Sequence, residues 1–111
     1  MADFPESLAH LTGFQWDTGN SEKNWHSHAV SCAEAEEAFL NLPVVVTPDL
    51  KHSRGEPRFA LLGRTNADRP LFVAFTTRDT LARVISARPM NRIERRIYEQ
   101  VRQDAEEDPS L

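Results

Sequence analysis

The sequence predicts a single α+β domain, in which an antiparallel sheet of about four strands carries two helices before it and one after it. Two observations lead to this prediction. Three apolar, β-rich runs follow one another between residues 58 and 88, and the gaps between them are short enough only for hairpins. Helical spacing of apolar residues flanks those runs on both sides, and 111 residues leave room for one domain of ordinary size.

The first elements are predicted from alternation and from helix-capping residues. Residues 14–17 alternate apolar and polar side chains, as a short strand does. A helix is expected over about residues 20–28. Ser31 and Glu34 have the spacing of a capping box and start a second helix that ends near Leu40. The side chains expected on its buried face are Ala35, Ala38 and Phe39.

The remaining elements are predicted from β-branched runs, turn formers and a second capping box. The expected strands are Val44–Val46, Arg58–Arg64, Pro70–Thr77 and Leu81–Arg88. Asn66 and Asp68 are typical turn residues between two of them. Asn91 and Glu94 repeat the capping-box spacing and start a helix that ends near Gln103. The apolar stripe that should dock this helix on the sheet is Ile93, Ile97 and Val101.

The ends of the chain are expected to lie outside the domain. Residues 1–13 are interpreted as a flexible leader and residues 104–111 as an acidic tail, so the domain spans residues 14–103. The leader has no Lys or Arg of a signal peptide, and no apolar run reaches the roughly 18–20 residues of a membrane span. The single cysteine, Cys32, excludes a disulfide framework and a cysteine-based zinc site. We therefore expect a cytoplasmic protein without membrane contact.

The charge pattern is more informative than the net charge of −4. Residues 1–50 carry one basic and eight acidic side chains, residues 51–102 carry twelve basic and five acidic ones, and residues 103–111 carry four acidic ones. Eleven of the thirteen basic residues are arginines, whose planar fork matches phosphate oxygens. A basic block of this kind is typical of a polyanion partner, and the alternative is a solvated face of internal ion pairs such as Arg95–Glu99.

The other chemical signals are weak. His26 and His28 lie two residues apart, which places them on different faces of a helix, so a metal site is disfavoured. His52 lies in a polar loop, where functional side chains are common. Cys32 is interpreted as either a low-pKa thiol or, more commonly, a small buried residue. The standard phosphate-loop, nucleophile-elbow and zinc-protease motifs are missing.

Three blocks in order resemble the BrnT family of type II toxin–antitoxin toxins. The first is Phe-Gln-Trp-Asp at residues 14–17, followed by His-Ala-Val-Ser and Glu-Ala within residues 28–35. The second begins His-Ser-Arg-Gly-Glu-Pro-Arg-Phe and ends Leu-Gly-Arg within residues 52–64, and the third lies within residues 83–99. Each block alone is weak, but the three in register are specific.

The chain departs from the family pattern in the first half. Asn20 and Ser27 stand where the family usually has lysine, Ala29 replaces a glycine and Cys32 replaces a phenylalanine. The resemblance implies a RelE-like fold and endonucleolytic RNA cleavage without a cofactor or metal, which would inhibit translation. It also implies a BrnA-like ribbon-helix-helix antitoxin as partner, with operator DNA bound only through that antitoxin.

Roles are then expected for individual residues. The catalytic candidates are Arg64 and Arg88, as clamps on the scissile phosphate, and His28 or His52, as general base. The RNA-binding candidates are Arg58, Arg83, Arg92, Arg95, Arg96 and Tyr98. Tyr98 would stack on a base or, equally, pack in the core. The supporting candidates are Trp16, Asp17 and Glu94. The alternative function is a catalytically weak or inactive module whose arginine-rich surface binds the antitoxin. Direct DNA binding is less favoured, because no helix-turn-helix pattern is present.

Overall fold

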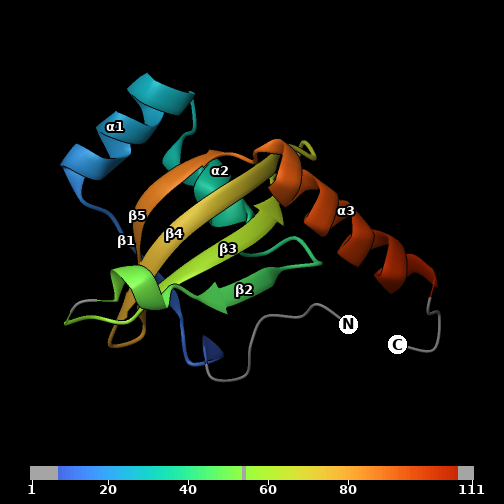
Figure 1. Ribbon diagram of the computed structural model, residues 1–111. Helices are drawn as coiled ribbons and strands as arrows, with labels where there is room; N and C mark the ends of the chain where they lie inside the picture. Colours follow the sequence, from blue (N-terminus) through green and yellow to red (C-terminus); the bar gives the residue numbers. More distant parts are fainter. Residues whose placement is uncertain (1–7, 54, 108–111) are drawn as a thin grey trace.

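A computed structural model describes residues 8–53 and 55–107 and shows the predicted α+β class (Figure 1). The elements are β1 (Gly13–Gln15), α1 (Thr18–His28), α2 (Cys32–Glu37), β2 (Val45–Pro48), the short 3-10 helix η2 (Leu50–His52), β3 (Arg58–Arg64), β4 (Pro70–Arg78), β5 (Leu81–Pro89) and α3 (Arg92–Glu107). Both predicted capping boxes are present, at Ser31–Glu34 and at Asn91–Glu94. The three long strands therefore form where alternation and turn residues placed them.

The sheet is mixed and has five strands in the order β1-β5-β4-β3-β2. Strands β2 to β5 are antiparallel neighbours, as the short gaps predicted. Strand β1 is added at the edge and runs parallel to β5, with Gly13 opposite Leu81. This pair joins the two ends of the domain, so hairpin spacing alone could not predict it.

One face of the sheet forms the hydrophobic core. Its largest fully buried strand side chains are Leu61, Leu71, Val73, Phe75 and Val84. Phe39, just after α2, packs edge-on against Phe75 with ring centroids 5.0 Å apart. A side chain at Gly63 would collide with the backbone carbonyl of Ala38, so this close approach requires glycine. The prediction that Ala35, Ala38 and Phe39 are buried is confirmed.

The opposite face of the sheet is crossed by α3 at one end (Figure 1). The predicted docking of this helix through Ile93 and Ile97 is wrong, because these side chains are 70% and 49% exposed. Tyr98 is instead fully buried, and Glu94 reaches the sheet at Arg88. The helix is therefore rotated by roughly one residue step, about 100°, from the expected orientation.

The boundaries of the domain extend beyond the predicted span. Leu8 is buried in the core, and the backbone amide of Thr12 donates to the carbonyl of Thr80 at 2.7 Å. The segment 8–13 is thus part of the folded structure, and α3 continues to Glu107. The rest of the expected leader and tail, residues 1–7 and 108–111, lies outside the described residues. No helix in the described part of the chain is long and apolar enough to cross a membrane.

Candidate active site and nucleic-acid interface

Four arginines share the sheet face opposite the core: Arg58, Arg64, Arg83 and Arg88. Arg58 and Arg64 are both on β3, an even number of residues apart, so they project to one face. Thr76 lies opposite both Arg58 and Arg83, and directly opposed residues share a face. Phe72 lies opposite both Leu62 and Arg88, and Leu62 is on the same face of β3 as Arg64. Arg88 therefore shares this face with Arg64.

A one-residue bulge in β5 brings Arg83 and Arg88 to the same face. These two residues are five apart, so strict alternation would place them on opposite faces. The register instead pairs Phe75 with Val84 and Ala74 with Ser86, which leaves Ile85 unpaired. The bulge therefore decides that β5 contributes two arginines, rather than one, to the open face.

The four arginines lie in pairs at the two ends of this face. Arg64 is opposite the first residue of β4, and Arg88 is on the strand beyond it, so about 10 Å separates their backbones. We call this the Arg64–Arg88 end. Arg58 and Arg83 form the Arg58–Arg83 end, about 20 Å away along β3.

Arg88 is held by a carboxylate and an aromatic ring. Its two terminal nitrogens donate to the two oxygens of Glu94 at 2.8 and 2.9 Å, and its guanidinium lies 4.1 Å from the ring centre of Phe72. Burial opposes ionisation of Glu94, but the hydrogen bonds from Arg88 and from the Asn91 amide outweigh it and lower the pKa of this carboxyl. The edge of the guanidinium between the two terminal nitrogens is therefore occupied by Glu94. The other edge, which carries Nε, makes no hydrogen bond to any described residue.

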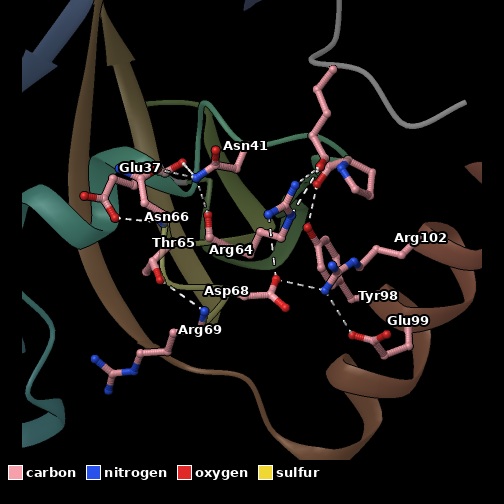
Figure 2. Close-up of polar contacts among 12 residues, drawn as sticks. Glu37, Asn41, Arg64, Thr65, Asn66, Asp68, Arg69, Tyr98, Glu99 and Arg102 are labelled. Carbon is pink, nitrogen blue, oxygen red and sulfur yellow. Dashed lines mark hydrogen bonds and ion pairs between the residues drawn. The ribbon is translucent and has the colours of Figure 1, made fainter. Parts of the chain in front are cut away.

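Arg64 is held by a backbone carbonyl and faces a carboxylate. Its Nε and Nη2 donate to the carbonyl of Leu42 at 3.3 and 2.8 Å, and its Nη1 lies 3.7 Å from Asp68. Asp68 has a left-handed backbone, with φ of 65°, in the β3–β4 turn. Arg102 of α3 also donates to Asp68, at 3.0 Å, so α3 is tied to the turn beside Arg64 (Figure 2).

Tyr98 cannot stack on a base, which corrects its assignment as an RNA-binding residue. Its ring is fully buried, and its hydroxyl donates to the carbonyl of Pro43 at 2.8 Å (Figure 2). Burial also raises the pKa of this phenol. Tyr98 therefore anchors α3, and base stacking would require it to leave the core.

The Arg58–Arg83 end contains His52 and Asp17. Nδ1 of His52 lies 2.9 Å from Asp49, and this hydrogen bond chiefly holds the pKa of the Asp49 carboxyl below its ordinary value. Arg83 pairs with Asp17 at 3.2 Å. The backbone amide of Asn20, more than this arginine, holds the pKa of Asp17 below its ordinary value. Asp17 also caps α1, so this carboxylate has a structural role.

The two catalytic histidine candidates lie at different ends of the sheet. Asp49, the partner of His52, is bonded through its amide to the Arg58 carbonyl at 2.7 Å, so His52 lies about 20 Å from Arg64. The carbonyl of His28 instead accepts from Arg69, which immediately precedes β4. The four catalytic candidates thus do not form one site, and His52 is separated from the arginine clamps.

The other candidate residues divide into exposed and structural ones. Arg92, Arg95 and Arg96 are exposed on α3, and no carboxylate of the described residues lies within ion-pairing distance of them. Trp16 is partly buried, and its ring nitrogen donates to Glu36 at 2.7 Å. Trp16 therefore supports the fold between β1 and α2 rather than the open face.

Sequence reasoning missed the residues that shape the turn beside Arg64. Asn41 donates its side-chain amide to the carbonyl of Arg64 at 3.1 Å and to Asn66 at 2.9 Å (Figure 2). Arg69 pairs with Glu34 at 3.0 Å and also donates to the carbonyl of Ala29 at 2.9 Å. No local pattern marks these contacts, because their partners come from distant parts of the chain.

The fold is that of a small ribonuclease toxin. It matches the crystal structure of the Brucella abortus ribonuclease toxin BrnT with a TM-score of 0.57 and 22% identity, over 73% of this chain and 99% of that chain. Residues 16–94 match the family described as ribonuclease toxin, BrnT, of type II toxin-antitoxin system. The chain therefore belongs to the BrnT family of ribonuclease toxins. No curated protein matches it.

Proposed function

We propose that this chain is an active, metal-independent endoribonuclease that cleaves RNA on the open face of its sheet. Cleavage of messenger RNA in the cytoplasm would inhibit translation and arrest growth. A BrnA-like ribbon-helix-helix antitoxin would neutralise the toxin and bind operator DNA for the complex. Membership of a type II toxin family supports an antitoxin partner in general.

The observation that carries this proposal is the orientation of Arg64 and Arg88. Each guanidinium is fixed on one edge, Arg64 by the Leu42 carbonyl and Arg88 by Glu94. The free edge of Arg88 carries Nε–H and one Nη2–H, which is a bidentate donor for a phosphate. Two fixed cations at one end of an open face can bind the extra negative charge of a phosphorane-like transition state without reorganising.

The chemistry uses the 2′-hydroxyl of RNA as the nucleophile. The hydroxyl loses its proton to a base and its oxygen attacks the adjacent phosphorus, while the 5′-oxygen leaves and takes up a proton. The sheet face would hold the attacking and leaving oxygens in line. We assign His28 as the base, because its carbonyl accepts a hydrogen bond from Arg69, which precedes β4 at the Arg64–Arg88 end of the sheet. His52 pairs with Asp49 at the Arg58–Arg83 end.

The rest of the RNA would follow the face towards the Arg58–Arg83 end. The surface between the two ends carries small side chains, Ala60 and Ala74, which lie opposite one another in the register. Small side chains leave room for a nucleic-acid backbone, and the arginines at both ends supply the phosphate contacts. Arg92, Arg95 and Arg96 would add contacts from α3.

A second function, that of an inactive antitoxin-binding module, is favoured by two observations. Arg88 already makes a complete bidentate pair with Glu94, and Asn20 and Ser27 replace the family lysines. If phosphate does not displace or share this pair, the arginine is structural and the chain does not cleave RNA.

Single-turnover cleavage of single-stranded and structured RNA tests the proposal. Arg64→Ala and Arg88→Ala should each lower the rate by about 10²–10³-fold, as loss of a transition-state donor does. Arg78→Ala is the matched control, because Arg78 makes an exposed pair with Glu56 at 3.1 Å and should leave the rate unchanged. Wild-type cleavage that survives both substitutions would show that the site is elsewhere. A wild-type chain that neither cleaves RNA nor arrests growth would favour the inactive module.

A further inference from the structure

Helix α1 packs on the sheet through a polar side chain. The structure describes α1 in full, and its one buried residue is Asn24, at 3% exposure. Ser21 and His28, three residues before and four residues after it, share its flank and are half-buried and polar as well. A helix on a sheet ordinarily buries an apolar stripe. The position of α1 therefore depends on what Asn24 contacts more than on apolar packing.

The Asn24 amide joins α1 to β5 at the residue before Arg88. Its Oδ1 accepts from the backbone amide of Ala87 at 3.1 Å, and this hydrogen bond is buried. Among the described residues, β1 pairs with β5 over residues 81–83, so without Asn24 the Ala87 N–H would be an unpaired donor at the strand edge. The bulge at Ile85, which turns Arg88 to the open face, lies two residues earlier. Asn24 thus fixes β5 beside the point from which Arg88 projects.

The same helix carries His28, the proposed base, one turn beyond Asn24. Residues four apart share a flank of a helix, so the two side chains lie on the same side of α1. At the start of α1, its capping residue Asp17 pairs with Arg83 of β5 at 3.2 Å. At the other end, the carbonyl of His28 accepts from Arg69 at 3.1 Å. These contacts place α1 beside β5 (Figure 1), with Asn24 between its two ends.

The amide of Asn24 is poorly used if its role is stability alone. Its Nδ2 is buried and has no hydrogen-bond partner among the described residues. A buried donor without a partner lowers stability, whereas an apolar side chain of the same size has no donor to satisfy. Departures of this kind are typical of positions that a functional site constrains. The Asn24 amide is therefore better explained by the geometry that it imposes on α1 and β5.

We propose that Asn24 is a positioning residue of the ribonuclease site, which sets the separation between His28 and Arg88. The inference rests on the proposed function, because that function makes these two residues the base and a phosphate clamp. The buried side chain of Asn24 reaches neither RNA nor the reacting atoms. It acts on the backbone of both partners, since His28 is one turn further along α1 and Ala87 immediately precedes Arg88. A displacement of about 1 Å between reacting groups can lower a rate by about 100-fold.

Single-turnover cleavage at saturating RNA tests this role. Asn24→Leu keeps the side-chain volume but removes the acceptor for the Ala87 amide, and it should lower the saturating rate by about 10–100-fold. The RNA concentration that gives half the maximal rate should stay unchanged, because the arginines of the open face are still present. Asn24→Asp restores an acceptor of the same length and should recover most of the lost rate. Tyr98→Phe is the matched control, since it also removes one hydrogen bond of a buried side chain, to Pro43 at 2.8 Å, and should leave the rate unchanged.

A double variant separates positioning from a loss of stability. If Asn24 acts through His28, His28→Ala should lower the wild-type rate by about 100-fold or more, but the rate of the Asn24→Leu chain by less than about tenfold. A merely structural Asn24 would give independent effects that multiply. Thermal unfolding checks that each variant is folded. Asn24→Gln, whose side chain is one methylene longer, displaces α1 from β5 while keeping the amide, and it replaces Asn24→Leu if that variant does not fold.

The outcomes separate this inference from the proposed function. A folded Asn24→Leu chain that cleaves RNA at the wild-type rate overturns the inference and leaves the function standing. Effects of Asn24 and His28 that multiply overturn it as well, as does a loss seen only as weaker RNA binding. A wild-type chain that cleaves no RNA removes the proposed function, and the positioning role falls with it.

Discussion

Glu94 both caps α3 and holds Arg88, so its replacement should destabilise the domain, and replacement by alanine should cost more than replacement by glutamine. Its carboxylate accepts from the Asn91 amide at 2.9 Å and forms the bidentate pair with Arg88, and its side chain is only 17% exposed. Glu94→Gln keeps the cap acceptor and removes the charge, which should cost about 1 kcal/mol. Glu94→Ala also removes the cap and should cost about 2 kcal/mol in total.

The assay is urea unfolding at neutral pH, supported by thermal melts. A cost of about 2 kcal/mol corresponds to a fall in Tm of roughly 10 °C for a domain of this size. The control is Glu99→Gln on the same helix, because Glu99 is 62% exposed and lies 3.7 Å from Arg102. An exposed pair of this kind should contribute less than about 0.5 kcal/mol.

The pH dependence gives an independent check of the same pair. Because the folded-state pKa of Glu94 lies below its ordinary value of 4.5, the ionised carboxylate stabilises the fold above that value. The contribution is lost as the pH falls through the folded-state pKa. The difference between wild type and Glu94→Gln should therefore shrink in acid. The reasoning is refuted if Glu94→Gln is as stable as wild type at neutral pH, or if Glu99→Gln costs as much.

Four further predictions follow from the same contacts. Ala29→Gly should stabilise the domain by up to about 1 kcal/mol in urea unfolding, because Ala29 has a left-handed backbone with φ of 53° at the end of α1; a loss of stability would contradict this. Gly63→Ala should destabilise the domain by about 1–3 kcal/mol, since the added methyl group would collide with the Ala38 carbonyl. Gly55→Ala has open space around it and should cost only the backbone strain of its φ of 80°, about 1 kcal/mol, so a smaller cost at Gly63 than at Gly55 would contradict the clash. Tyr98→Phe should lower the unfolding free energy by about 1 kcal/mol and leave RNA cleavage unchanged, because the hydroxyl bonds Pro43; a loss of cleavage in a folded variant would restore Tyr98 to the site. Arg58→Ala should make the negative slope of log RNA affinity against log salt concentration less steep by about 0.7, because one phosphate contact is lost. An unchanged slope would show that RNA does not contact the Arg58–Arg83 end.

Much of the fold could be predicted because its signals are local. The strand β3 begins and ends at the predicted residues, since alternation and the turn formers Asn66 and Asp68 act within a few residues. The capping boxes at Ser31–Glu34 and Asn91–Glu94 were predictable for the same reason. The parallel β1–β5 pair was not predictable, because its two strands lie far apart in the sequence and no local pattern links them.

The orientation of α3 shows where periodicity fails. The apolar stripe predicted a buried Ile93 and Ile97, but the domain instead buries the large ring of Tyr98, whose hydroxyl donates to the carbonyl of Pro43. The pairs from Glu94 to Arg88 and from Arg102 to Asp68 stabilise the same rotation. Amphipathic spacing identifies an apolar face but does not show whether the domain itself or a partner covers it.

The candidate site was predicted by residue type more than by arrangement. The arginine-rich block indicated a polyanion surface, and four of its arginines do share one face of the sheet. That sharing depends on the bulge at Ile85, which reverses the alternation between Arg83 and Arg88 and carries no sequence mark. The separation of His52 from Arg64 is likewise set by the length of β3.

The sequence by itself determined the α+β class, the positions of the three long strands and of both capping boxes, and the family, because these depend on local patterns and on blocks kept in order. Only the tertiary structure decided which side chains meet. It pairs Asp17 and Glu34 of the acidic half with Arg83 and Arg69 of the basic half, so the charge asymmetry along the chain is partly neutralised in space. The physical reason is that ion pairs, bulges and helix rotation depend on distances between residues far apart in sequence, which only packing of the whole domain sets.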